Sequence, residues 1–97
     1  MDLPFHRLVQ QDLRTVLDYY RTVGGDALAD RFFAELTALV KQVAAHPASF
    51  HPVSGGLRRA NMASFPYHLL YRERPRAVRV LILRHHRRHP ATGTQRS

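Results

Sequence analysis

The hydrophobic positions in the first half of the chain repeat with the period of an α-helix. From Gln10 onward, apolar side chains recur at i, i+3, i+4 and i+7, which places them along one helical face. Gly24 and Gly25 favour the end of this helix, because glycine readily adopts the left-handed conformation found at helix ends. The pattern therefore predicts a first helix from Gln10 to the glycine pair. Its apolar face is formed by Leu13, Val16, Leu17 and Tyr20.

A second helix is predicted after the glycines. Asp26 is a favourable N-cap residue, and apolar residues keep the helical spacing for about five turns. The helix is predicted to end at His46, because the residue before a proline disfavours helical backbone. Neither helix is apolar on all sides, so we expect an antiparallel hairpin lying on a sheet. The apolar positions of the second helix are Ala29, Phe32, Phe33, Leu36, Leu39, Val40 and Val43.

The remaining apolar segments predict the strands of that sheet. Residues 3–9 are short and mostly apolar, which favours a strand ahead of the first helix. Residues 47–56 are rich in Pro, Ser and Gly and predict a loop. Residues 77–84 have apolar side chains at both odd and even positions, as expected for a strand covered on both faces. In order, the strands predicted after the loop are 57–63, 67–72 and 77–84, the last two joined by a turn at 73–76.

These elements predict an α+β fold: a strand, an antiparallel helical hairpin and a three-stranded antiparallel meander, in the order βααβββ. The chain has 97 residues, which is the size of one small domain. We expect a single domain over residues 1–97, with its core in 3–90 and a frayed polar tail at 91–97. There is no room for a separate cofactor-binding module, and no cofactor is expected.

Positive charge is concentrated in the second half of the chain. The whole sequence carries 15 Lys and Arg against 7 Asp and Glu, a net charge of +8. Residues 51–97 hold ten arginines against Glu73 alone, which gives that half a charge of +9. Guanidinium groups bind phosphate and carboxylate well, so the expected partner is a polyanion or an acidic protein.

Composition also excludes several classes of protein. There is no cysteine, which excludes disulfides, a thiolate nucleophile and a cysteine-type zinc site. The longest uninterrupted apolar run, Val80 to Leu83, is far too short to span a bilayer, and the N-terminus lacks the features of a signal peptide. A soluble cytoplasmic protein is therefore expected.

Three motifs occur in a fixed order along the chain. They are Asp12-Leu13 followed by Tyr19-Tyr20, then Phe65-Pro66-Tyr67 opening a strand, and finally His85, Arg87, Arg88 and Pro90 in the spacing His-x-Arg-Arg-x-Pro after the last strand. Together they resemble the RelE/ParE superfamily of bacterial type II toxin–antitoxin toxins over residues 3–90. The resemblance implies a small toxin held inactive by a cognate antitoxin, whose acidic or amphipathic segment covers the basic surface.

The superfamily divides by target, and the fold does not decide between its branches. ParE-like members poison DNA gyrase, whereas RelE-like members are metal-independent endoribonucleases that cut mRNA on the ribosome. The two long helices resemble the hairpin of ParE-like members. The one lysine, Lys41, lies on the second helix, and no aromatic residue follows Pro90, both of which count against a nuclease. A ParE-like gyrase inhibitor of the plasmid-stabilisation type is thus favoured. The alternatives are a RelE-like mRNA interferase and a non-toxic nucleic-acid-binding or decayed member.

Candidate residues follow from these alternatives. A metal-free ribonuclease needs cations around one phosphate together with an acid and a base, and histidine is suited to the latter near neutral pH. No metal site is predicted, because the spacing of His85 and His89 brings ligands together only on a helix. If the chain is RelE-like, the catalytic candidates are Arg59, Arg84, His85 and His86. The candidates for binding the target or the antitoxin are Arg58, Arg59, Tyr71, Arg72, Arg84, Arg87 and Arg88.

Overall fold

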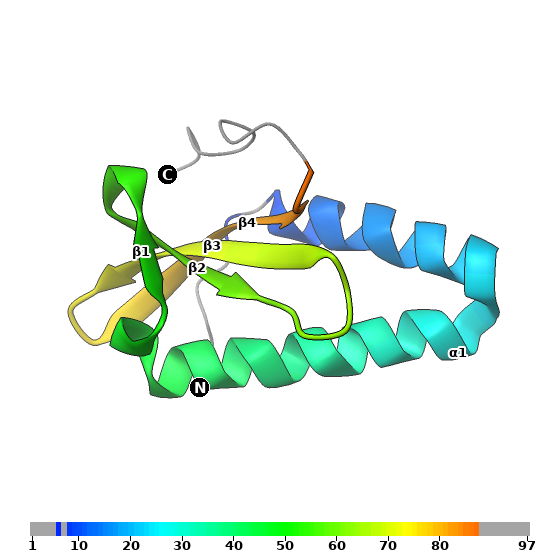
Figure 1. Cartoon of the computed structure of the whole chain (residues 1–97), viewed down its shortest axis with the longest axis horizontal. Coiled ribbons are helices and arrows are strands. Elements are labelled where there is room, and N and C mark those ends of the chain that lie inside the picture. The colour runs from blue at the N-terminus through cyan, green and yellow to red at the C-terminus, as the bar shows by residue number, and fades with distance from the viewer. Residues whose placement is uncertain (1–5, 7, 88–97) are drawn as a thin grey trace.

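The computed structural model describes residue 6 and residues 8–87 (Figure 1). Its first element, α1 (Val9–Ala45), is bent into two arms at Gly25, where φ is 78° and ψ is −178°. The arms run antiparallel, and their turn projects beyond the sheet at the end opposite β1 (Figure 1). The predicted helical hairpin and its glycine turn are therefore confirmed. Gly24 is also confined, since a Cβ there would lie 2.3 Å from Leu28 Cδ2.

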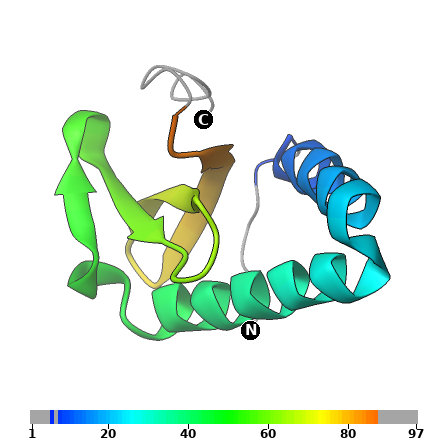
Figure 2. The same ribbon diagram turned by 45° about the vertical axis from the view of Figure 1, so that its right-hand side comes forward.

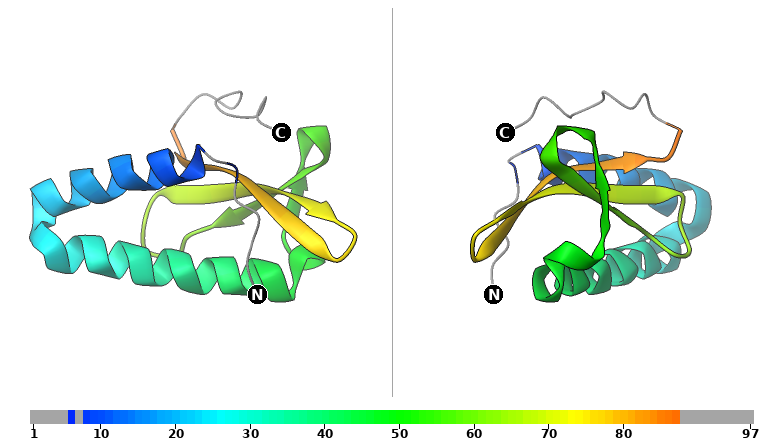
Figure 3. Two further views of the ribbon diagram at one scale, coloured as in Figure 1. Left: turned by 180° about the vertical axis from the view of Figure 1, so that it is seen from behind. Right: turned by 60° about the vertical axis from the view of Figure 1, so that its left-hand side comes forward.

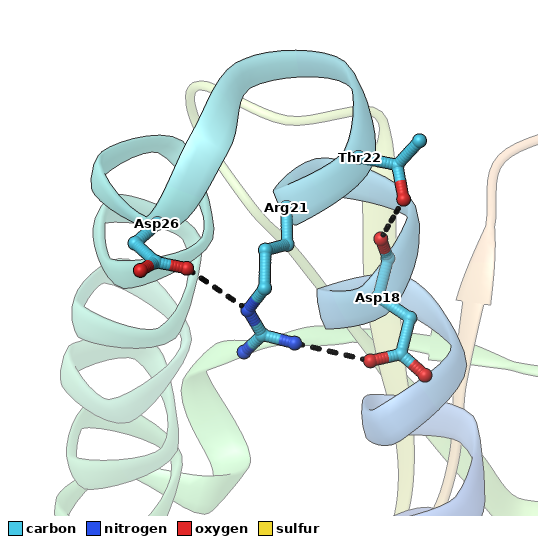
Figure 4. A network of polar contacts seen from close by, with 4 residues as sticks. All are labelled: Asp18, Arg21, Thr22 and Asp26. Carbon is cyan, nitrogen blue, oxygen red and sulfur yellow. Dashed lines mark hydrogen bonds and ion pairs between the residues drawn. The ribbon is translucent and has the colours of Figure 1, made fainter.

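A polar network joins the two arms beside the turn (Figure 4). Arg21 places NH1 3.1 Å from Asp18 Oδ1 and Nε 3.2 Å from Asp26 Oδ1. Thr22 Oγ1 donates to the Asp18 carbonyl oxygen at 2.9 Å. Asp26 thus makes an ion pair across the turn in place of the predicted capping hydrogen bond. Because these groups are exposed, the network contributes little to the free energy of folding, and its main effect is to orient the turn.

Four antiparallel strands follow in the order β1-β2-β3-β4. The predicted meander is confirmed in the last three strands, β2 (Leu57–Asn61), β3 (Tyr67–Arg74) and β4 (Ala77–His85). The predicted loop at 47–56 differs from expectation, because it contains the short strand β1 (His51–Val53) between the 3₁₀ turns Pro47–Ser49 and Ser54–Gly56. Positive φ angles at Gly55 and Gly56 return the chain tightly enough for β1 to pair with β2.

Most of the predicted first strand, residues 3–9, lies outside the described residues. Of the described part, Leu8 is in a turn and Val9 already begins α1. The backbone N–H of His6 donates to the Val80 carbonyl oxygen at 2.8 Å. His6 therefore lies beside β4.

The core lies between the two arms of α1 and one face of the sheet (Figures 2 and 3). Phe32 is fully buried and packs edge-on against Phe65 and Tyr67, at ring-centroid distances of 5.0 and 5.5 Å. Tyr20 joins the same aromatic group from the first arm. Glu35 Oε2 accepts the backbone N–H groups of residues 63 and 64 at 2.9 and 3.0 Å, which ties the second arm to the loop between β2 and β3.

The opposite face of the sheet, here called the outer face, carries a second apolar cluster made of Leu57, Leu70, Leu81 and Ile82. The register of β3 and β4 shifts between Leu70 and Tyr71, which pair with Ile82 and Val80 respectively. Leu81 is the extra residue of this bulge, so Leu81 and Ile82 both reach the outer cluster. The prediction that β4 is covered on both faces is confirmed.

Candidate functional site

Four basic side chains meet on the outer face beyond the apolar cluster. Arg59 comes from β2, His68 from β3 and Arg84 from β4, and His86 follows directly after β4. His68 is paired with Arg84 in the register of β3 and β4, and strand alternation turns all three strand residues to the same face. His86 is fixed by its backbone N–H, which donates to the Pro66 carbonyl oxygen at 2.9 Å.

These four side chains, here called the Arg–His cluster, form a continuous chain of contacts. Arg84 Nε donates to His68 Nε2 at 2.9 Å, and His68 Nδ1 lies 2.9 Å from His86 Nδ1. The two imidazole planes are only 12° apart. Arg59 NH2 lies 3.2 Å from His86 Nδ1, while Arg59 Nε donates to Asn61 Oδ1 at 2.7 Å. The cluster therefore links three strands through side chains alone.

The cluster is buried at its centre and positively charged around it. His68 is 1% exposed. Burial lowers the pKa of His68 to about 3, and the charges of Arg59, Arg84 and the neighbouring histidines act in the same direction. Burial also lowers the pKa of His86, with a further contribution from Arg59, and lowers the pKa of the Arg84 guanidinium. Every charged neighbour that shifts the pKa of His68 or His86 is itself a base.

Two of the predicted binding residues lie away from the cluster. Arg58 points to the helix side of β2, where its Nε lies 3.3 Å from Glu73 Oε1 and its NH1 donates to the Phe50 carbonyl oxygen at 2.7 Å. Tyr71 is fully buried, and its hydroxyl donates to the Pro47 carbonyl oxygen. Burial raises the pKa of Tyr71. Both side chains hold the segment around β1 against the core.

Arg72 and His85 also lie outside the cluster. Arg72 NH1 donates to the Gly55 carbonyl oxygen at 3.2 Å, which supports the turn after β1. His85 lies on the helix side of β4, where its ring packs edge-on against Tyr67 at 5.1 Å. The exposed Arg87 donates its backbone N–H to His85 Nδ1 at 3.0 Å. The structure thus brings Arg59, Arg84 and His86 together and places Arg58, Tyr71 and Arg72 elsewhere. His85 lies beside the cluster, with its ring centroid 6.5 Å from that of His86. Arg88 and His89 lie outside the described residues.

His68, the buried member of the cluster, was not among the site residues predicted from the sequence. A signal was present, because His68 is a polar residue within an otherwise apolar stretch of β3 (YHLLY). A polar side chain in such a position is buried only where it finds hydrogen-bonding partners. Those partners, Arg84 and His86, come from the far end of the next strand, so their identity depended on the register of the sheet.

A groove of about 490 Å³ lies on the helix side, between the first arm of α1 and β4. Asp12 lines it and accepts the Leu83 backbone N–H at 3.3 Å. Tyr19 also lines it and is 57% exposed. Two residues of the first motif therefore border a groove, whereas Tyr20, their neighbour, packs into the aromatic core. In the part of the chain that the structure describes, no helix has a stretch long and apolar enough to cross a bilayer.

Known proteins share both the fold and the sequence pattern. A structure described as a chromosomal ParDE TA system from P. aeruginosa matches with a TM-score of 0.76 at 20% identity, covering 88% of this chain and 95% of that one. Toxin ParE2 of Mycobacterium tuberculosis, from strains CDC 1551 / Oshkosh and H37Rv, is 26% identical over 88 residues, which are 91% of this chain and 84% of the relative. A model of the family described as ParE toxin of type II toxin-antitoxin system, parDE, matches residues 3–90.

The fold is a helical hairpin on an antiparallel sheet. This fold and the family match together identify a toxin of the RelE/ParE superfamily. The resemblance carried by the three motifs is therefore confirmed. Because the family model spans nearly all of the chain, the chain belongs to the ParE family of type II toxin–antitoxin toxins.

Proposed function

We propose that this toxin inhibits bacterial growth by acting on DNA gyrase and that a cognate antitoxin neutralises it. The observation that carries the proposal is the match of residues 3–90 to the ParE family, since the fold is shared by both branches of the superfamily. The two-armed α1 and the absence of lysine from the second half of the chain also support the ParE-like branch. In this role the protein is the toxin of a plasmid-stabilisation module and needs no catalytic residues of its own.

Pulse-labelling separates the two branches. The chain is induced alone in bacteria, and thymidine and amino-acid incorporation are followed in the same culture. Inhibition of gyrase predicts that thymidine incorporation falls first, with amino-acid incorporation following later. Purified toxin should likewise block supercoiling by purified gyrase. If amino-acid incorporation fell before thymidine incorporation, and purified toxin left gyrase supercoiling unaffected, the proposal would be overturned.

The proposed antitoxin contacts are the basic residues at the end of the sheet where β4 ends. Arg87 is exposed, and its side chain makes no ion pair with a described residue. Together with Arg59 and Arg84 it gives this end of the sheet a positive charge suited to an acidic segment, and Arg88, the next residue in the sequence, remains a predicted contact. The relative solved as a ParDE TA system, named for a toxin and antitoxin pair, supports a protein partner of this kind.

A charge reversal tests this surface against a matched control. Arg87→Glu is expected to weaken binding to the product of the adjoining gene by about tenfold, because it removes an attraction and adds a repulsion. Arg74→Glu makes the same charge change at the exposed last residue of β3, at the far end of the sheet, and should leave binding unchanged. Equal effects of both variants would show that net charge, and not this surface, drives the association.

The Arg–His cluster favours a second candidate function, the RelE-like endoribonuclease. Arg59, Arg84 and His86 could contact a phosphate, and His85 lies one residue away. Replacing His85 and His86 by Ala tests it. Loss of toxicity with antitoxin binding retained would indicate acid–base chemistry, whereas retained toxicity would exclude a histidine-dependent nuclease. A chain that leaves growth unaffected yet binds nucleic acid in a strongly salt-dependent way would be the non-toxic alternative.

A further inference from the structure

The two edges of the sheet differ in how well they could pair with a strand from another molecule. One edge is β1, which has three residues, and Pro52 in its middle has no N–H to donate. The other edge among the described strands is β4, which has nine residues. Its segment 78–83 (VRVLIL) is apolar except for Arg79. A segment of this composition on an open edge is prone to pair with another chain, so the β4 edge requires protection.

Two residues near the start of the chain occupy backbone groups of β4 that face away from β3. The Val80 carbonyl oxygen accepts the backbone N–H of His6 at 2.8 Å. Further along the strand, the Leu83 N–H donates to Asp12 Oδ2 at 3.3 Å. His6 acts through its backbone, as a neighbouring strand does, whereas Asp12 reaches β4 with its side chain from the first turn of α1. The Asp12 carboxylate therefore takes the place of a strand carbonyl oxygen at Leu83.

The space beside Leu83 is open enough for another strand to approach. The groove of about 490 Å³ lies between the first arm of α1 and the second half of β4, and Asp12 and Leu83 both line it. The edge ends after His85, because the backbone N–H of His86 donates to the Pro66 carbonyl oxygen on the β3 side. Leu83 is thus the position at which a strand could join β4 from the groove, and Asp12 occupies that position.

A carboxylate is well suited to prevent such pairing. It accepts the Leu83 N–H, but it has no N–H of its own with which to continue a ladder of strand hydrogen bonds. An incoming strand would have to displace the carboxylate and pack its apolar side chains beside a negative charge. The helix holds Asp12 in place, because its backbone N–H donates to the Leu8 carbonyl oxygen at 3.0 Å.

We propose that Asp12 is an edge-protecting residue, which closes β4 at Leu83 and so prevents two copies of this chain from pairing through their β4 strands. The excluded partner is a second copy, because β4 is apolar on both faces and would offer matching apolar side chains to another β4. Two copies paired in this way would be related by a two-fold axis, with their β4 strands antiparallel. The proposal concerns the free toxin and holds whatever its target is.

The oligomeric state of the full chain, measured by light scattering over a range of concentrations, tests this role. Asp12→Ala should form dimers or larger assemblies at concentrations where the unmodified chain is monomeric. Asp30→Ala makes the same change at an exposed position on the second arm and should stay monomeric. Asp12→Asn keeps an acceptor oxygen and should associate less than Asp12→Ala. A monomeric Asp12→Ala would overturn the proposal, and so would equal association of all three variants, which would attribute the effect to net charge.

Hydrogen exchange at the Leu83 amide tests the contact at the edge itself. In the unmodified chain this amide should be protected, and exchange at the rate of a free amide would refute the role of Asp12. In Asp12→Ala it should exchange about tenfold faster at low protein concentration and become protected again as the concentration rises and a second β4 pairs with it. Exchange at Leu70, on the central strand β3, should stay unchanged. Faster exchange at both positions would show that the variant associates through unfolding, which would also overturn the proposal.

Discussion

Lowering the pH should destabilise this protein even before its carboxyl groups begin to take up protons. The cause is the buried side chain of His68, whose pKa is lowered in the folded chain. In the folded chain the pKa of His68 is lowered to about 3, chiefly by burial, whereas in the unfolded chain it returns to 6.5, the ordinary value. Between these two values the unfolded chain binds more protons than the folded chain. Stability is therefore full above the unfolded pKa and falls as the pH is lowered below it.

The magnitude follows from the size of the shift. Each pH unit between the two pKa values changes the free energy of unfolding by about 1.4 kcal/mol. Lowering the pH from about 8 to about 5 should therefore cost about 2 kcal/mol from His68. Since pH 5 is above the ordinary pKa of Asp and Glu, carboxylates add little in this interval. His86, whose pKa is also lowered, acts in the same direction.

Urea denaturation at a series of pH values measures this loss, and two variants locate its origin. His68→Gln keeps a donor and an acceptor but cannot ionise, so it should be less stable at pH 8 and should lose much of the decline toward pH 5. His51→Gln removes an exposed histidine from β1 and should retain the decline. If His68→Gln and the unmodified chain declined in parallel, the reasoning from the buried imidazole would be wrong.

Three further substitutions test the fold by urea denaturation. Gly25→Ala should destabilise by about 1–3 kcal/mol, since φ is 78° and ψ is −178° there, and an unchanged midpoint would argue against the kinked turn. Phe32→Ala should cost about 3–5 kcal/mol because the ring is fully buried, and a loss of only about 0.5 kcal/mol, the size of a surface effect, would contradict the aromatic core. Glu35→Gln should lower the free energy of unfolding by about 1 kcal/mol, because the carboxylate accepts two backbone N–H groups. Those hydrogen bonds lower the pKa of Glu35. The difference in stability between the two chains should therefore disappear in acid, where the carboxyl group of the unmodified chain is protonated.

The elements that depend on local pattern were predictable from the sequence. The apolar period of 3.6 predicted both arms of α1, and the glycine pair predicted the turn. Short, partly or mostly apolar stretches bounded by turn residues predicted β2, β3 and β4. The segment around β1 was not predicted as a strand, because its Pro, Ser and Gly content is typical of a loop. Its three residues are a strand only because β2 offers an edge with which to pair.

The candidate site was partly predictable for the same reason. Arg59, Arg84 and His86 were selected by residue type and by their positions on or just after the predicted strands, and the structure brings these three together. Arg58 was selected on the same grounds, yet it lies on the opposite side of β2 because adjacent strand residues face opposite ways. Neighbouring positions in the sequence were thus separated by the pleat of a single strand.

The sequence by itself determined the fold class, the family and the concentration of positive charge in the second half of the chain, because each of these depends on composition, on local periodicity or on motifs. Only the tertiary structure decided that His68 is the buried centre of the basic cluster. That role depends on the register of β3 and β4, which sets His68 against Arg84, and on the turn after β4, which returns His86 to the same face. Register and turn geometry are relations between distant segments, and no local pattern encodes them.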